Sequence, residues 1–167
     1  ILITGASSGF GRVIATRLAA QGHIVYGSSR KALSDNPGFK MLQLDITDPV
    51  SVFNAISTIL EEQGSIDVLV NNAGIDYIGL LQDMSSEDWD RILRTNLTSV
   101  FNCCKLAIPL MLPAGHGKII NISSVWGCAG ASCEVAYSAT KGGVNAFTKA
   151  LAKELAPSNI QVNAIAC

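Results

Sequence analysis

The chain has 167 residues, of which 49% are hydrophobic and 15% charged, and its formal net charge at pH 7 is −1. This composition excludes a disordered chain and is typical of one globular domain with a sizeable core. A nearly neutral chain gives no reason to expect nucleic acid or an acidic membrane as a partner. We also expect no membrane span, because polar residues interrupt the apolar stretches, and no signal peptide, because the chain opens in a strand.

Short apolar runs alternate with helical patterns along the chain. Asp48 before Pro49, and Ser85 three residues before Asp88, predict the starts of two helices. The alternation predicts an α/β fold, a doubly wound parallel sheet with helices on both faces. We expect strands near residues 1–4, 23–28, 40–44, 67–71, 117–122 and 160–165, and helices near 10–21, 48–63, 86–112 and 135–155.

The first strand runs into a glycine-rich turn. Gly5, Gly9 and Gly11 separate the apolar run 1–4 from the first helical pattern. Glycines allow a tight turn and a close approach to a pyrophosphate, and a helix N-terminus offers it free N–H groups. The sequence therefore predicts a Rossmann-type, dinucleotide-binding domain. The spacing is TGxxxGxG rather than GxGxxG, and a glycine turn without a ligand is the alternative interpretation.

The second strand ends in basic residues instead of an acid. In NAD-binding domains an acid about 20 residues beyond the glycines binds the ribose hydroxyls. Here Ser28 and Ser29 lead into Arg30 and Lys31, and the first acid is Asp35. An arginine at this point can pair with a 2′-phosphate, so we predict NADP(H) rather than NAD(H). An ordinary solvated loop is the alternative interpretation of the two basic residues.

Tyr137 and Lys141 stand four residues apart in a helical pattern, so they share one helix face. The lysine charge favours the phenolate form of the tyrosine, which suits the pair to acid–base catalysis near neutral pH. Ser124, just upstream, can hold a substrate oxygen beside the phenol. The spacing alone is weak evidence, because a packed tyrosine beside a solvated lysine also fits it.

Together these motifs resemble the short-chain dehydrogenase/reductase family over essentially the whole chain. TGASSGFG at 4–11 resembles its cofactor turn, and NNAG at 71–74 resembles the motif that ends its fourth strand and lines the cofactor. LDIT at 44–47 supplies Asp45, which in the family bonds the adenine amino group, and Ile46, which lies beside the ring.

The resemblance also implies a catalytic tetrad. TNLTSVF at 95–101 places the family's catalytic asparagine at Asn96, and the remaining members are Ser124, Tyr137 and Lys141. Ser124 is preferred to its neighbour Ser123 because its thirteen-residue gap to Tyr137 fits the family pattern.

The implied reaction is hydride transfer between the nicotinamide and a carbonyl or alcohol carbon. Tyr137 would exchange the proton on the substrate oxygen, and Ser124 would polarise that oxygen. Lys141 would favour the phenolate and bond the nicotinamide ribose, while Asn96 would hold a proton-relaying water. No metal site is predicted, and the predicted cofactor-binding residues are Gly5, Ser7, Ser8, Gly9, Phe10, Gly11, Arg30, Asp45, Ile46, Asn72, Ala73, Gly74, Tyr137 and Lys141.

Two parts of the chain resemble different members of the family. The stretch from residue 22 to 74 is similar to hydroxysteroid- and retinoid-type dehydrogenases, and the stretch from 85 to 167 to bacterial 3-oxoacyl-carrier-protein reductases. The second stretch contains the chemistry, so we predict a carbonyl reductase for a small ketone, an alcohol or an acyl thioester, with fatty acid biosynthesis as one prospect. The alternatives are a hydroxysteroid- or retinol-type dehydrogenase and a regulator that binds NADP without chemistry. A sugar-nucleotide epimerase or dehydratase fits less well, because that branch has TGxxGxxG.

Both ends of the chain look cut against the family pattern. Cys167 stands where the family usually has the proline of a loop that closes over the nicotinamide. We therefore expect residues 1–167 to be one Rossmann-type domain, truncated at its C-terminus, that lacks the substrate-loop segment and the last strand.

The five cysteines show no metal-ligand or redox spacing, so we expect reduced thiols in a cytoplasmic protein. Members of the family are commonly dimers or tetramers. The small residues on the last long helix allow close helix approach and favour a homodimer or homotetramer. They are Ala136, Ala139, Gly143, Ala146 and Ala150.

Overall fold

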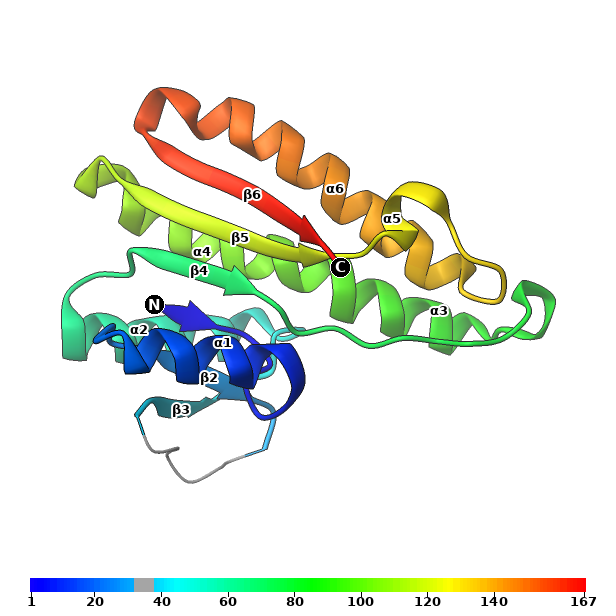
Figure 1. The fold of residues 1–167 in the computed structure, drawn as a ribbon, viewed down its shortest axis with the longest axis horizontal. Helices are drawn as coiled ribbons and strands as arrows, with labels where there is room; N and C mark the ends of the chain where they lie inside the picture. Colours follow the sequence, from blue (N-terminus) through cyan, green and yellow to red (C-terminus); the bar gives the residue numbers. More distant parts are fainter. Residues whose placement is uncertain (32–37) are drawn as a thin grey trace.

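A computed structural model describes residues 1–31 and 38–167, and Asp35 lies outside the described residues (Figure 1). Its centre is a six-stranded sheet in the order β3-β2-β1-β4-β5-β6. Every neighbouring pair is parallel, so all strands end at the same edge of the sheet. The strands are β1 (Leu2–Ile3), β2 (Tyr26–Ser29), β3 (Lys40–Gln43), β4 (Val68–Asn71), β5 (Gly117–Ser123) and β6 (Ile160–Ala166).

Helices cover both faces of this sheet, which confirms the predicted doubly wound α/β fold. Figure 1 shows α1 on one side of the strands and α2 and α4 on the other. The helices are α1 (Gly9–Ala20), α2 (Pro49–Gln63), α3 (Ser86–Leu93), α4 (Ser99–Ala114), α5 (Trp126–Ala129) and α6 (Val135–Leu155). A π-helical segment, η2 (Arg94–Thr98), joins α3 to α4, and short 3-10 turns are η1 (Leu81–Asp83) and η3 (Ala156–Ser158).

The two faces of the sheet form two separate core clusters. In β1 the neighbours Leu2 and Ile3 are both 0% exposed but belong to different clusters, because successive side chains on a strand point to opposite faces. Buried residues of α2, α4 and α6 join the larger cluster, and Ala15 of α1 joins the smaller one. Burial on both faces explains why β1 and β4 read as continuous apolar runs.

The predicted helix starts are confirmed by side-chain caps. Asp48 Oδ1 accepts a hydrogen bond from the N–H of Val50 at 3.0 Å, and Ser85 Oγ accepts one from the N–H of Asp88 at 3.0 Å. Both bonds satisfy N–H groups that have no partner inside the helix.

Two predicted elements differ from the structure. The strand predicted at 23–28 begins only at Tyr26, because the short β1 offers its first paired residue, Leu2, at that position. The single helix predicted at 86–112 is interrupted by the π segment and runs on to Ala114. The four-residue helix α5 was not predicted, since its sequence is too short for a periodic pattern.

One helical run bears on the expectation that the chain has no membrane span. Residues 86–114 are long and apolar enough to cross a membrane by length and composition alone. Five residues of this run, Val100, Cys103, Cys104, Ala107 and Met111, are buried in the larger core cluster. A helix that packs its apolar face into a core passes the same test, so the run is weak evidence for a membrane span.

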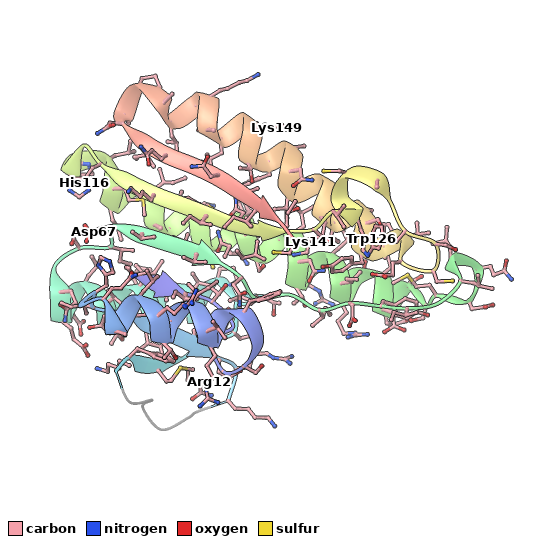
Figure 2. All side chains as sticks on the ribbon, viewed as in Figure 1. Arg12, Asp67, His116, Trp126, Lys141 and Lys149 are labelled. Atoms are coloured by element: carbon pink, nitrogen blue, oxygen red, sulfur yellow. The ribbon has the colours of Figure 1, made fainter. Side chains whose placement is uncertain are left out.

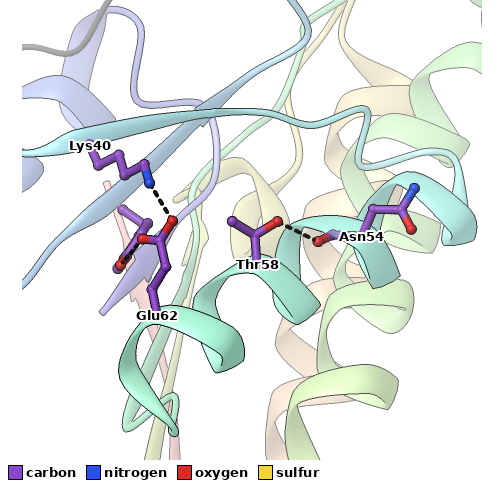
Figure 3. A network of polar contacts seen from close by, with 5 residues as sticks. Lys40, Asn54, Thr58 and Glu62 are labelled. Carbon is purple, nitrogen blue, oxygen red and sulfur yellow. Dashed lines mark hydrogen bonds and ion pairs between the residues drawn. The ribbon is translucent and has the colours of Figure 1, made fainter.

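At the edge where the strands begin, α2 is tied to β2 and β3 by a polar network. Glu62 pairs with Lys40 and accepts a hydrogen bond from the Tyr26 hydroxyl at 2.7 Å. One turn earlier, the Thr58 hydroxyl donates to the carbonyl of Asn54 at 3.0 Å (Figure 3). This network lies at the opposite end of the strands from the glycine turn.

A second network is fully buried and joins β4, β5 and α6. Asn71 Nδ2 donates to Asn121 Oδ1 at 2.8 Å, and Asn121 Nδ2 donates to Thr148 Oγ1 at 2.9 Å. Thr148 in turn donates to the carbonyl of Val144 at 2.7 Å. Asn121 is 0% exposed, so each of its bonds replaces one that water would otherwise make.

The Asn121→Ala variant should lower the free energy of unfolding by about 2–4 kcal/mol, because it removes a buried hydrogen-bond partner from both Asn71 and Thr148 and leaves space in the core. Urea denaturation of the two proteins measures the difference. The control is Asn54→Ala on the exposed side of α2, which should change the value by no more than about 0.5 kcal/mol. Equal effects of the two variants would show that the buried network does not stabilise the fold.

Candidate active site

The glycine turn after β1 is fastened to the end of β4. Asn72 Nδ2 donates to the carbonyls of Thr4 and Gly5, at 2.9 and 3.1 Å. In return, Thr4 Oγ1 accepts hydrogen bonds from the N–H groups of Asn72 and Ala73, at 3.0 and 3.1 Å. Thr4 was not predicted as a site residue, although its place before the first glycine was the available signal.

Two glycines of the turn meet different requirements. Gly5 has φ +68°, and a Cβ there would lie 2.9 Å from the Cα of Ala73. A Cβ on Gly11 would lie 2.4 Å from Asn72 Nδ2 and from the carbonyl oxygen of Gly5. Gly11 therefore lets α1 pack against the turn, and its contacts are with the protein rather than with the cavity.

The N-terminus of α1 is suited to bind an anion. Its N-cap is Ser8, whose side chain makes no capping hydrogen bond within the described residues. In α2 and α3, by contrast, the side chains of Asp48 and Ser85 accept capping hydrogen bonds. The first turn of α1 also carries no acid among the described residues. The free N–H groups of α1 and its positive dipole end are available to a phosphate.

A cavity of ≈ 960 Å³ opens above this turn at the carboxyl edge of the sheet. Among the described residues that line it, Arg30, Lys31, Arg91 and Arg94 are basic and Asp45 is the only acid. Arg91 and Arg94 were not predicted, because no motif marks them. The predicted cofactor-binding residues on its wall are Gly5, Ser7, Ser8, Gly9, Phe10, Arg30, Asp45, Ile46, Asn72, Ala73 and Gly74, whereas Gly11, Tyr137 and Lys141 lie outside the lining.

Asp45 is held as an ionised acceptor on the cavity wall. Its Oδ1 accepts from the hydroxyl of Thr47 at 2.7 Å and from the Thr47 N–H at 2.9 Å. The pKa of Asp45 lies below its ordinary value. The largest cause is the hydrogen bond from the Thr47 hydroxyl; the bond from the Thr47 N–H and the charge of Arg30 add to it, whereas burial opposes them. A carboxylate here can accept from an amino group of a ligand.

The π segment brings the predicted catalytic asparagine inward. Asn96 is 1% exposed; its Oδ1 accepts from the N–H of Ile75 at 2.8 Å, and its Nδ2 donates to the Ile75 carbonyl at 2.7 Å. Nδ2 also lies 3.2 Å from Thr140 Oγ1 on α6. π segments occur frequently at functional sites, and this one also places Arg94 and Thr95 on the cavity wall.

Tyr137 and Lys141 lie together on α6, as the spacing predicted. Lys141 Nζ is 5.6 Å from the centre of the Tyr137 ring and donates to the carbonyl of Ile122 at 2.7 Å. Lys141 is 5% exposed, and burial lowers its pKa. No hydrogen bond joins the Tyr137 hydroxyl to another of the described residues, which leaves it available to a ligand.

The two adjacent serines have different partners. Ser123 Oγ donates to the backbone carbonyl of Lys141 at 3.3 Å, so it holds β5 to α6. Ser124 Oγ accepts from the N–H of Trp126 at 3.3 Å, at the start of α5, and donates to the carbonyl of Cys167 at 3.5 Å. The choice of Ser124 as the catalytic serine stays a prediction from the sequence.

Gly74 connects the cavity with the predicted tetrad. A Cβ on Gly74 would lie 3.3 Å from Asn96 Oδ1 and 3.7 Å from Lys141 Nζ, and Gly74 itself lines the cavity. Figure 2 shows Lys141 and Trp126 at the carboxyl end of β5, with Asp67 and His116 at the opposite edge of the sheet. A ligand that fills the cavity from Arg30 to Gly74 would therefore end beside Lys141.

Among the described residues, no group of three or more His, Cys, Asp or Glu side chains is placed to hold a metal. Burial raises the pKa values of the Cys103 and Cys104 thiols to about 12, so both stay protonated at neutral pH. The described cysteines form no disulfide.

The comparison with family models agrees with this geometry. The model described as short chain dehydrogenase matches residues 1–167. The chain belongs to the short chain dehydrogenase family.

Relatives and a solved structure point the same way. The chain is 46% identical over 162 residues to a 3-ketodihydrosphingosine reductase of Bacteroides thetaiotaomicron, covering 97% of this chain and 60% of that protein. It is 44% identical over 172 residues to the 3-oxoacyl-(acyl-carrier-protein) reductase FabG of Escherichia coli, covering 99% of this chain and 70% of that protein. A crystal structure of a short-chain dehydrogenase from Streptomyces avermitilis matches 99% of this chain and 63% of its own, with 32% identity and a TM-score of 0.94. The chain thus spans less than two thirds of the Bacteroides relative.

The Asp45→Asn variant tests the electrostatics of the cavity wall. Because folding lowers the pKa of Asp45, its carboxylate stabilises the fold above the ordinary aspartate pKa of about 3.9, and this contribution disappears as pH falls through the lower folded value. The stability difference between the original protein and the variant should therefore shrink from pH 5 towards pH 2, as measured by urea unfolding at each pH. A difference that stays constant over this range would contradict the assigned cause.

Proposed function

We propose that this chain forms the cofactor-binding and catalytic part of an NADP(H)-dependent carbonyl reductase. The observation that carries the proposal is the position of Lys141 beside Gly74 on the wall of a cavity that basic residues also line, with the Tyr137 ring next to Lys141. NADP(H) would supply or accept the hydride, and the protein's own groups would handle the proton.

Different residues along the cavity would bind different parts of the cofactor. The free N–H groups at the start of α1 would bind the pyrophosphate, and Asp45 would accept from the adenine amino group. Arg30 would pair with the 2′-phosphate, which supports NADP(H) over NAD(H). These residues would hold the nicotinamide end near Gly74 and leave the proton chemistry to the tetrad.

At the tetrad, the Ser124 hydroxyl would donate to the substrate oxygen and the Tyr137 hydroxyl would give that oxygen its proton. The charge of Lys141 lies close to the ring and would stabilise the phenolate that remains. Asn96 is fixed to the backbone of Ile75, so its role would be to position groups around Lys141 rather than to move. In the reverse direction the same phenolate would accept the proton from an alcohol.

The substrate is proposed to be a ketone or the matching secondary alcohol, free or as an acyl thioester. Two relatives are named for the reduction of 3-keto and 3-oxoacyl compounds, and this common group supports a 3-keto substrate here. A hydroxysteroid- or retinol-type substrate is the alternative, and a regulator that binds NADP(H) without turnover is another. The first is tested by comparing ketones, and the second by any turnover that depends on Tyr137.

We further propose a homodimer or homotetramer in the cytoplasm, with neither nucleic acid nor membrane as partner. Ala139, Ala146 and Ala150 of α6 are exposed and would allow close helix approach in an interface. Ala136, which was expected on the same face, is 2% exposed and packs inside the chain.

The Tyr137→Phe variant should lower turnover of a 3-keto substrate by at least about 100-fold and leave NADPH binding unchanged, because it removes only the proton donor. Steady-state kinetics and fluorescence titration with NADPH measure the two effects. The matched control is Tyr26→Phe, which removes a hydroxyl bonded to Glu62 at the other end of the sheet and should retain activity. Near-normal turnover in the Tyr137 variant would disprove its assigned role.

The Arg30→Asp variant should shift the preference from NADPH towards NADH by about tenfold or more, since it replaces a partner of the 2′-phosphate with a like charge. Dissociation constants for both cofactors give the ratio. The control, Lys149→Asp, makes the same charge change on the exposed side of α6, outside the cavity, and should leave the ratio unchanged. An unchanged ratio in the Arg30 variant would mean that other residues select the cofactor.

A further inference from the structure

Ser28, the third residue of β2, carries a buried hydroxyl without a partner. The residue is 1% exposed, and its Oγ is the only buried side-chain nitrogen or oxygen among the described residues that makes no hydrogen bond. Buried hydroxyls in folded proteins almost always have a partner, because an unpaired one destabilises the fold. A serine at such a position therefore suggests that its hydroxyl has a partner that is not part of the chain.

The register of β2 places this side chain towards the adenine end of the cavity. Tyr26 belongs to the larger core cluster together with Leu44 and Ile46. Gly27 faces the other side, where a Cβ would meet Ala6 and Phe39. Since side chains alternate along a strand, Ser28 lies on the same face as Tyr26, towards Leu44 and Ile46.

Ser28 also lines the cavity, and so do Leu44, Asp45 and Ile46. The main chain of Ser28 is already fixed, because its carbonyl accepts from the N–H of Ala6 at 2.8 Å. Its hydroxyl, in contrast, is not held by any bond, and rotation about Cα–Cβ between staggered positions moves only this one oxygen. Such a rotation would turn the hydroxyl from the protein interior into the cavity.

We propose that Ser28 is a further cofactor-binding residue, whose hydroxyl turns into the cavity and donates to an acceptor on the adenosine half of the dinucleotide. The proposal rests on the proposed binding of NADP(H) and adds a contact to it. The acceptor is an oxygen of the ribose or its 2′-phosphate, or a ring nitrogen of adenine, all of which accept hydrogen bonds. The unpaired hydroxyl then gains its missing partner only when the cofactor is bound.

This role predicts that replacing Ser28 weakens cofactor binding without destabilising the free protein. Ser28→Ala removes no hydrogen bond from the free protein, so its unfolding midpoint in urea without cofactor should stay the same or rise. The dissociation constant for NADPH should increase about threefold to tenfold, the value of one hydrogen bond. A serine with a merely structural role would show the reverse, a lower midpoint with unchanged binding.

The matched control is Thr148→Val, which removes a buried hydroxyl that is bonded to Val144 and Asn121 and lies outside the cavity lining. This variant should lower the unfolding midpoint and leave the dissociation constant for NADPH unchanged. The two variants thus separate a hydroxyl that serves the fold from one that serves the ligand.

Fluorescence titrations with NADPH and NADH, on the original protein and both variants, decide the question. If Ser28→Ala loses affinity for NADPH alone, the acceptor is on the 2′-phosphate. If it loses affinity equally for both cofactors, the acceptor is on the ribose or adenine. Either result supports the proposal. Unchanged binding of both cofactors to Ser28→Ala would overturn it. If the original protein bound neither cofactor, the proposed function itself would fail, which is a separate result.

Discussion

The carboxamide of Asn72 is the contact on which the arrangement of the site depends. It bonds the carbonyls of Thr4 and Gly5 and thereby joins the ends of β1 and β4. The strand order reverses between these two neighbours, since β2 and β3 lie on one side and β5 and β6 on the other. A crevice opens at such a reversal in parallel sheets, and the bonds of Asn72 hold together the two strand ends that border it. The conformation that the glycines allow is therefore held in place by Asn72.

The residues of the predicted tetrad are held by a different constraint, the cost of burying polar groups. Lys141 is nearly inaccessible, and its ammonium group is compensated by the carbonyl of Ile122. Asn96 is satisfied by the backbone of Ile75 and by Thr140. These bonds join α6 to β5, η2 to the segment after β4, and η2 to α6, so the groups beside Gly74 are held to the sheet. Such preorganisation is what proton transfer at a fixed point requires.

Much of this arrangement could be predicted from the sequence. The order of strands and helices, the caps at Asp48 and Ser85 and the pairing of Tyr137 with Lys141 follow from local patterns with a known period. The π segment could not be predicted, because a single turn of five residues is too short to show a period of its own and no motif marks it. The contributions of Arg91 and Arg94 to the cavity, and the orientation of Ser28, depend on which strand lies opposite, which local sequence does not encode.

The π segment has a consequence that reaches both ends of the site. Asn96, inside this segment, bonds both Ile75, which follows β4, and Thr140 of α6. The wider turn lets Asn96 meet both while Arg94 and Thr95 remain on the cavity wall. A ligand that presses on that wall therefore acts on the same turn that holds the tetrad asparagine. The cavity wall and the predicted catalytic asparagine thus share one five-residue segment.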